Sequence, residues 1–488
     1  MLSDMHVYAV VLAGGSGQRF WPLSRELNPK QLLSMFGTES LIAQAVHRIS
    51  PFTGGGAGVT VVTSERLFDE LRNHLTAQPD TELHRVRYIQ EPSARNTAPA
   101  IALAAATLVA EDPDAIMVVL PSDHLLEDGD VWTDCIRAAT AVAAEGWLVT
   151  IGIAPVRPEP GYGYIRAAGP LAEFSVGSVT PHVVAEFVEK PDLERAKDYV
   201  ASGDYFWNAG IFVMKAARVL EELDAAGGNE AHVADVVRGI VALPSEERNG
   251  DDARAAFETI TPVSVDVAIM ERSDRVAVIP APLKWSDVGS LLALEDVAEP
   301  DEGGNVRVGR GIDIDSRDTI VYSTDRLVAT LGCEGLIVVD TADATLVLPK
   351  DRVQDVRRVV DALKAQGAPE VTQPKVSLRP WGSWTSLLSS PTYQIKFIEV
   401  KSGSRLSLQK HHHRSEHWIV VSGTAVVTRD DEKVKVHANE GIFLPSGCVH
   451  RLENCGRVPL CLIEVQVGEY LGEDDIVRLE DDWGRDRA

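Results

Sequence analysis

The sequence contains 488 residues, which is too many for one hydrophobic core of ordinary size, so two or three domains are expected. Hydrophobic residues make up 45% of the chain and charged residues 24%, as in globular proteins that fold in water. The formal net charge of −25 argues against a general nucleic-acid or anionic-membrane surface. A phosphate-binding site in such a chain would need cations concentrated locally.

The five cysteines are scattered along the chain and form no CxxC pair, which is typical of reduced thiols in a cytosolic protein. No secretory peptide precedes the first predicted strand, and no apolar run is long enough to cross a bilayer. We therefore expect a cytoplasmic protein that binds neither nucleic acid nor membranes.

Residues 1–300 alternate short β-branched runs with longer helical patterns, which predicts an α/β domain with a Rossmann-like, mostly parallel mixed sheet. Ligands of such sheets gather beyond the carboxyl ends of the strands. Central strands are predicted at residues 7–12, 58–63, 116–120 and 148–153, and helices at 98–110 and 132–145. The segments after the first and third of these strands should therefore meet in one crevice.

A glycine-rich segment, residues 13–30 (AGGSGQRFWPLSRELNPK), follows the first strand. Glycines let main-chain N–H groups approach an anion closely, and basic side chains add full positive charges. The missing Gly-Lys-Ser/Thr argues against a P-loop, and Phe20 stands where a dinucleotide motif needs its last glycine. An ordinary glycine-rich turn is the alternative. The candidate phosphate-binding residues are Gly14, Gly15, Ser16, Gly17, Arg19 and Lys30.

Two aspartates are candidate ligands for Mg²⁺. Asp123 follows the strand at 116–120, where a carboxylate can hold a hard cation against phosphates. Asp287 lies far away in the sequence, in the segment 284–290 (KWSDVGS). A helix cap at Asp123 and a turn at Asp287 are the structural alternatives.

The spacing of Arg19, Pro22 and Lys30 resembles that of sugar-1-phosphate nucleotidyltransferases, in which aspartates at the places of Asp123 and Asp287 share a metal. Four further segments resemble mannose-1-phosphate guanylyltransferases, namely residues 91–100, 161–165, 187–192 and 207–212. The resemblance implies guanine contacts from the first segment and mannose-phosphate contacts from the others, with the candidates Glu91, Asn96, Thr97, Gly163, Glu189, Lys190 and Asn208. It implies that GTP and mannose 1-phosphate give GDP-mannose and pyrophosphate, with Mg²⁺ as cofactor. Another nucleotide or glucose 1-phosphate is the alternative.

The pattern changes after residue 300. Residues 301–370 combine short alternating strands with one amphipathic helix at 351–366, and the family resemblance suggests a β-helix-like connector. Residues 371–488 are rich in strands and glycine turns, as in a β-barrel or jelly roll.

This last domain contains the spacing G-x5-Q-x-H-x4-E-x6-G from Gly403 and P-x-G-x2-H-x3-N from Pro445, which resembles the two motifs of cupin barrels. Such mixed nitrogen and oxygen ligation suits Zn²⁺, Co²⁺ or a similar divalent ion. His413 shares the strand parity of His411, so the register of the ligands stays open. A metal-free structural barrel is the alternative. The candidate ligands are Gln409, His411, Glu416 and His450.

The Gln-x-His pair resembles the metal site of phosphomannose isomerases, and nearly the whole chain resembles the bifunctional phosphomannose isomerase/mannose-1-phosphate guanylyltransferases. This implies interconversion of mannose 6-phosphate and fructose 6-phosphate by proton transfer at a metal-polarised carbonyl. Arg414 is a candidate for phosphate binding or enediolate stabilisation, or else a strand-surface arginine. Two other hypotheses are a monofunctional guanylyltransferase with a structural cupin and a non-catalytic sugar-nucleotide sensor. A homo-oligomer is compatible with each hypothesis.

Overall fold

The computed structural model describes residues 6–15, 17–127 and 129–480. These residues form two compact units. The larger unit contains the described residues up to 69 together with residues 80–341 and 345–367, and the smaller contains residues 70–79, 342–344 and the described residues from 368 onward. No helix within the described ranges is both long and apolar enough to span a membrane.

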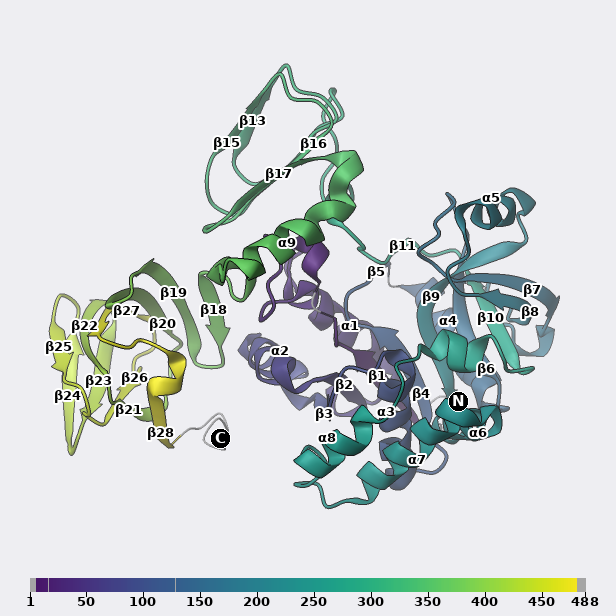
Figure 1. The fold of residues 1–488 in the computed structure, drawn as a ribbon, viewed down its shortest axis with the longest axis horizontal. Helices are drawn as coiled ribbons and strands as arrows, with labels where there is room; N and C mark the ends of the chain where they lie inside the picture. Colours follow the sequence, from purple (N-terminus) through teal and green to yellow (C-terminus); the bar gives the residue numbers. More distant parts are fainter. Residues whose placement is uncertain (1–5, 16, 128, 481–488) are drawn as a thin grey trace. The chain divides into compact units, whose positions relative to one another are not determined.

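A nine-stranded sheet forms the centre of the larger unit (Figure 1). The pairs β1–β2, β2–β3, β1–β4 and β6–β10 are parallel, whereas β9 runs antiparallel to both β4 and β6. The four predicted strands lie within one residue of β1, β2, β4 and β6. The order across the sheet is β3 (Arg87–Glu91), β2 (Val59–Ser64), β1 (Val7–Leu12), β4 (Ile116–Pro121), β9 (Tyr205–Lys215), β6 (Leu148–Ile153), β10 (Val276–Ala281), β8 (His182–Val188) and β7 (Tyr164–Pro170).

Helix α3 (Thr97–Glu111) is apolar on nearly all sides because it packs between the sheet and two further helices, α6 and α7. Its sequence is rich in alanine, which allows this close packing and favours the helix. The predicted helices at 98–110 and 132–145 correspond to α3 and α4. The remaining helices of this part of the chain are α1 (Leu41–Ile49), α2 (Glu65–Ala77), α4 (Asp130–Ala144), α5 (Leu193–Ser202), α6 (Ala216–Ala226), α7 (Gly228–Ala242) and α8 (Asp251–Glu258).

The connector consists of short parallel rungs stacked on one another, as expected for a β-helix-like module (Figure 1). Its predicted single helix at 351–366 is instead a 3₁₀ segment, Lys350–Asp355, followed by α9 (Val356–Ala365). Val353 and Val356 are both buried, and a spacing of three residues places them on one face of a 3₁₀ turn. The strands are β12 (Val306–Val308), β13 (Gly311–Ile314), β14 (Ile320–Ser323), β15 (Val328–Leu331), β16 (Leu336–Asp340) and β17 (Thr345–Pro349).

The smaller unit is built from two antiparallel sheets that enclose an apolar core around Trp418, Val427 and Leu452. Alternate residues of each strand point into this core, so polar residues at inward positions are conspicuous. One sheet has the order β18 (Val376–Arg379), β19 (Gly382–Ser389), β20 (Tyr393–Val400), β27 (Leu460–Gly468), β22 (Arg414–Ser422) and β25 (Gly441–Leu444). The other has the order β24 (Glu432–His437), β23 (Thr424–Arg429), β26 (His450–Glu453), β21 (Leu408–His411) and β28 (Ile476–Glu480).

Candidate active sites

A short two-stranded ribbon brings the two predicted aspartates together in the larger unit. Strands β5 (Leu125–Leu126) and β11 (Trp285–Ser286) pair antiparallel, with Leu125 opposite Ser286. Asp123 precedes β5 and Asp287 follows β11, so an antiparallel register places both at the same end of the ribbon. Both residues line one cavity at the carboxyl end of β4, where the strand pattern had placed Asp123.

Lys30 links the two aspartate loops. Its Nζ lies 2.8 Å from Asp123 Oδ2 and donates to the main-chain carbonyls of Asp287 and Val288 at 2.8 and 2.9 Å. Only 7% of the Lys30 side chain is exposed. Val288 adopts φ +48°, an uncommon conformation for a β-branched residue that the Lys30 contact helps to hold. Burial alone would raise the pKa of Asp123, but the Lys30 ammonium holds it below its ordinary value.

The cavity has a volume of about 470 Å³ and unites most of the predicted nucleotide and sugar segments. Asn96 adopts φ +72° and its Oδ1 accepts the Thr97 N–H at 2.8 Å, while the Thr97 hydroxyl accepts from Val265 N at 2.9 Å. Burial raises the pKa of Glu91 to about 7. The predicted residues that line the cavity are Gly14, Gly15, Glu91, Asn96, Thr97, Asp123, Gly163, Glu189, Asn208 and Asp287.

Asn208 is fixed by hydrogen bonds at both ends of its amide. Its Oδ1 accepts from the Thr150 hydroxyl at 2.9 Å and from Gly210 N at 3.0 Å, and its Nδ2 donates to Asp266 Oδ1 at 2.8 Å. Asp266 also lines the cavity, and burial together with Glu189 raises its pKa to about 7. Sequence reasoning missed Asp266, although an acid within the apolar run VDVAIM was a usable signal.

A side chain at position 163 would crowd two of the cavity residues. A Cβ there would lie 2.8 Å from Glu189 Oε2 and 3.2 Å from Asn208 Cβ. Gly17 lies directly against Lys30. Its φ is +59°, and a Cβ at this position would lie 2.6 Å from Lys30 Cβ. Ser16, a predicted phosphate-binding residue, lies outside the described residues.

A second cavity of about 740 Å³ shares Gly161, Tyr162 and Asp287 with the first. The predicted cations Arg19 and Lys190 line this second cavity and not the first. The Lys190 ammonium is paired with Glu189 Oε1 at 2.7 Å. Arg157, which the sequence did not single out, adds a third cation to the same wall.

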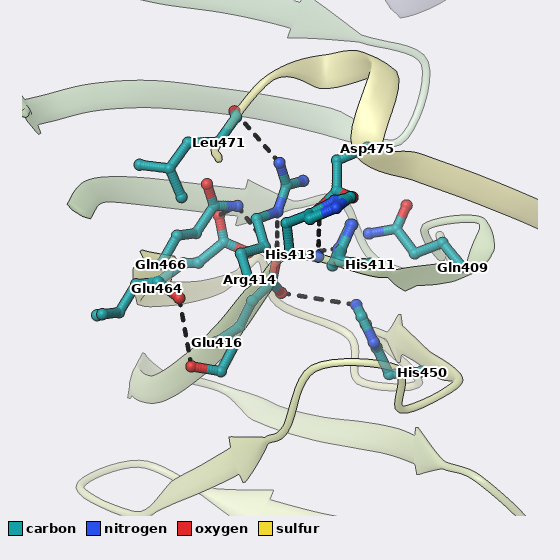
Figure 2. A network of polar contacts seen from close by, with 12 residues as sticks. Gln409, His411, His413, Arg414, Glu416, His450, Glu464, Gln466, Leu471 and Asp475 are labelled. Carbon is teal, nitrogen blue, oxygen red and sulfur yellow. Dashed lines mark hydrogen bonds and ion pairs between the residues drawn. The ribbon is translucent and has the colours of Figure 1, made fainter. Parts of the chain in front are cut away.

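In the smaller unit, three of the four predicted ligands form one buried cluster (Figure 2). The nitrogen and oxygen atoms that His411, Glu416 and His450 can offer to a metal all lie within 4.8 Å of one another. His411 Nε2 is 3.0 Å from Glu416 Oε1, and His450 Nε2 is 3.6 Å from Glu416 Oε2. Gln409 precedes His411 by two residues on β21, as predicted, and lies opposite His450 on β26.

The donor set of this cluster fits a divalent metal. His450 Nδ1 is held by the Cys448 carbonyl at 3.0 Å, which directs Nε2 inward, where it has no hydrogen-bond partner among the described residues. Burial lowers the pKa of His450, which favours the neutral, ligating imidazole. Burial acts to raise the pKa of Glu416, but the hydrogen bond from His411 and the charge of Arg414 help to hold the pKa far below its ordinary value. Two imidazoles and one carboxylate are ligands that Zn²⁺ and similar ions accept.

The structure answers two questions that the sequence left open, namely the strand parity of His413 and whether Arg414 lies at the surface. Strand β21 ends at His411 and β22 starts at Arg414, so a turn removes His413 from the parity of His411. His413 is 61% exposed and its Nδ1 lies 2.8 Å from Asp475 Oδ1, away from the cluster. The interpretation of Arg414 as a surface residue is wrong, because its side chain is only 2% exposed.

Arg414 is held between the cluster and the main chain. Its Nη1 donates to the carbonyls of Leu471 and Gly472 at 3.3 and 3.1 Å, and its Nε lies 3.5 Å from Glu416 Oε1 (Figure 2). A buried guanidinium needs such partners, because an unpaired charge in this core would be costly. Its position beside a ligand carboxylate supports a role in the site.

Three further buried residues surround Glu416, and the sequence did not single them out. Trp418 Nε1 lies 3.1 Å from Glu416 Oε2 and 3.0 Å from Glu464 Oε1. Gln466 Nε2 donates to Glu416 Oε1 at 3.1 Å and to Glu464 Oε2 at 2.9 Å. Burial, followed by the nearby Glu416 carboxylate, raises the pKa of Glu464 to about 8. The sequence signal for Glu464 and Gln466 was a polar residue at each of two inward positions of β27, on the same side of the strand as Leu460 and Leu462.

Comparison with known families defines the class of the protein. Residues 8–303 match the model of the nucleotidyl transferase family, residues 309–363 that of the MannoseP isomerase/GMP-like beta-helix domain, and residues 366–481 that of the mannose-6-phosphate isomerase C-terminal domain. The fold and the two sites therefore belong to a nucleotidyltransferase with an attached phosphomannose isomerase domain.

Individual relatives narrow the class to one family. The chain is 45% identical to the alginate biosynthesis protein AlgA of Pseudomonas aeruginosa over 98% of this chain and 97% of that protein. It is 41% identical to the mannose-1-phosphate guanylyltransferase of Escherichia coli K12 over 99% of this chain and the whole of that protein. A crystal structure described as a mannose-1-phosphate geranyltransferase from Thermus thermophilus is 31% identical, covers 74% of this chain and all of its own, and has a TM-score of 0.64. The chain belongs to the family of bacterial mannose-1-phosphate guanylyltransferases with a phosphomannose isomerase domain.

Proposed function

We propose that the larger unit transfers GMP from GTP to α-D-mannose 1-phosphate, giving GDP-mannose and pyrophosphate. The observation that carries this proposal is the single cavity in which the glycine-rich loop, both aspartates and the segments 91–97, 163, 189 and 208 meet. The names of the relatives, which are guanylyltransferases and alginate or xanthan biosynthesis proteins, support the same reaction.

The reaction is an in-line displacement at the α-phosphorus. A phosphate oxygen of the sugar phosphate forms the new P–O bond, the bond to the bridging oxygen breaks, and pyrophosphate leaves with the electron pair. No protein nucleophile is needed, so the protein acts by positioning and charge neutralisation. Lys30 offers its ammonium to the charge that develops at the α-phosphate. Arg19 is assigned to the departing diphosphate and Lys190 to the sugar phosphate, because both line the adjoining cavity.

Asp123 and Asp287 would hold Mg²⁺ in this site, since carboxylate oxygens are the ligands that this hard cation prefers. Lys30 contacts Oδ2 of Asp123, and Tyr162 contacts Oδ1 of Asp287. These two contacts do not involve Asp123 Oδ1 or Asp287 Oδ2. When bound, the ion supplies positive charge between the phosphates that the anionic chain otherwise lacks.

For the smaller unit we propose interconversion of mannose 6-phosphate and fructose 6-phosphate, with His411, Glu416, His450 and Gln409 holding Zn²⁺, Co²⁺ or a similar ion. Such an ion supplies polarisation of the carbonyl and hydroxyl at carbons 1 and 2. Arg414 keeps the Glu416 carboxylate in place and contributes positive charge beside it.

A matrix of four nucleoside triphosphates against mannose 1-phosphate and glucose 1-phosphate, read as pyrophosphate release, tests the transferase. We expect the fastest turnover with GTP and mannose 1-phosphate. No release with any pair would favour the sugar-nucleotide sensor, and a faster rate with another pair would replace the substrate assignment. The isomerase is tested on the chelator-treated full chain with and without added Zn²⁺ or Co²⁺, where absence of activity in every case would favour a structural cupin.

A further inference from the structure

Tyr162 connects the two cavities to one of the aspartates. It lies in the loop between Gly161 and Gly163 and lines both cavities. Its hydroxyl donates to Asp287 Oδ1 at 2.6 Å, a short bond of the kind formed to an ionised carboxylate. Asp287 belongs to a different loop, the one that follows β11, so this bond joins two segments far apart in the sequence.

The ring of Tyr162 is fixed independently of its hydroxyl. It packs edge-to-face against Trp207 with ring centroids 5.2 Å apart, and against Trp285 at the same distance. Trp285 in turn donates its Nε1–H to His124 Nδ1 at 3.3 Å, beside Asp123. Aromatic pairs of this geometry are stabilising, so the phenol oxygen has little freedom to leave Asp287.

The loop that carries Tyr162 also forms the wall assigned to the sugar phosphate. The carbonyl of Gly163 accepts from Asn208 N at 2.9 Å, and a Cβ at position 163 would lie 2.8 Å from Glu189 Oε2. Any ligand that orders this wall therefore acts on the residue that holds Asp287. Tyr162 therefore joins this wall to the Asp287 carboxylate.

We propose that Tyr162 is a positioning residue of the transferase site, which orients the Asp287 carboxylate and ties that orientation to the wall of the sugar-phosphate pocket. The inference rests on the proposed function, because it assigns Asp287 to a divalent cation. It predicts that losing the single hydroxyl weakens cation binding and slows turnover while leaving nucleotide affinity nearly intact.

Tyr162→Phe is the direct test, because the ring can keep its packing between the two tryptophans. Mn²⁺ binding to the full chain without substrates is measured from the paramagnetic resonance signal of the free ion. Asp287→Asn removes a proposed ligand of the transferase site only. The Mn²⁺ binding that it loses therefore belongs to this site, and the binding that it keeps belongs to the barrel. We expect the dissociation constant of the Asp287 site to rise about 10-fold in Tyr162→Phe, as for other residues that orient a ligand. We also expect kcat to fall while KM for GTP stays within about 2-fold.

Tyr205→Phe is the matched control. The Tyr205 hydroxyl also donates to a carboxylate, Glu186 Oε2 at 2.7 Å, and Tyr205 lines neither cavity. It should leave Mn²⁺ binding and kcat unchanged.

The inference is overturned if Tyr162→Phe binds Mn²⁺ and turns over like the wild type, or if both tyrosine variants lose the same amount. Absence of any Asp287-dependent Mn²⁺ binding in the wild type would overturn it as well. A wild-type chain that makes no GDP-mannose would instead refute the proposed function, and the Mn²⁺ comparison would still report on Tyr162.

Discussion

Lys30 is a buried cation whose ammonium contacts both aspartate loops. It pairs with the Asp123 carboxylate and with the carbonyls of Asp287 and Val288. A buried charge persists only where its partners compensate the lost hydration. The same contacts hold the ammonium against Asp123, which lines the first cavity, so the stabilising and the proposed catalytic roles of Lys30 use one geometry.

Replacing Lys30 by alanine should therefore lower kcat for GDP-mannose formation by about 10²–10³-fold, the cost of removing one preorganised charge donor. The measurement is pyrophosphate release, with circular dichroism to check that the chain is folded. Lys364→Ala is a suitable control, because Lys364 pairs with Glu26 at 2.7 Å and lines neither cavity. Near-normal turnover in Lys30→Ala would contradict the role assigned to this residue.

Glu91 predicts a pH dependence of stability. Burial raises its pKa from 4.5 to about 7, so in this window the folded chain holds a proton that the unfolded chain releases. Stability should therefore fall as the pH rises through this range, by up to about 3 kcal/mol for a shift of this size. In Glu91→Gln, which stays neutral, the difference in urea midpoint between about pH 5 and about pH 8 should shrink.

Glu173→Gln serves as the comparison for this measurement, because Glu173 is exposed and should leave the pH profile unchanged. An unchanged profile in Glu91→Gln would show that Glu91 is ionised throughout, and the account of its burial would be wrong.

At the level of elements, hydrophobic patterning predicted four strands of the large sheet, β1, β2, β4 and β6, to within one residue, because buried parallel strands are continuous apolar runs. Positions after strand ends were also predictable. Gly14 and Asp123, which follow β1 and β4, line the same cavity. Turn geometry was not predictable. Counting parity through residues 411–413 assumes a continuous strand, whereas the chain turns at His412 and His413.

This turn makes a sharp prediction about two neighbouring histidines. His411→Ala should weaken binding of Zn²⁺ to the barrel by about 10-fold or more and abolish isomerisation, because a ligand is lost. His413→Ala removes an exposed side chain paired with Asp475 and should retain the bound metal. Metal content after dialysis and the isomerase rate are the two measurements. Equal losses in both variants would mean that the ligand register is wrong.

At the level of the whole molecule, the contacts that the sequence could not supply are those between segments distant along the chain. The fold brings together Asp266 and Asn208, Tyr162 and Asp287, and Glu464 and Glu416, which are far apart in the sequence. The net charge of −25 predicted that a phosphate site would need locally concentrated cations, and Arg19, Arg157 and Lys190 line one cavity.

The most direct measurement is a crystal structure of the full chain with a non-hydrolysable GTP analogue and Mg²⁺. The account predicts the guanine base against residues 91–97, the phosphates between the Gly14–Gly15 amides and Lys30, and the ion on Asp123 and Asp287. A nucleotide bound elsewhere, with Lys30 and both aspartates in contact only with one another, would contradict it.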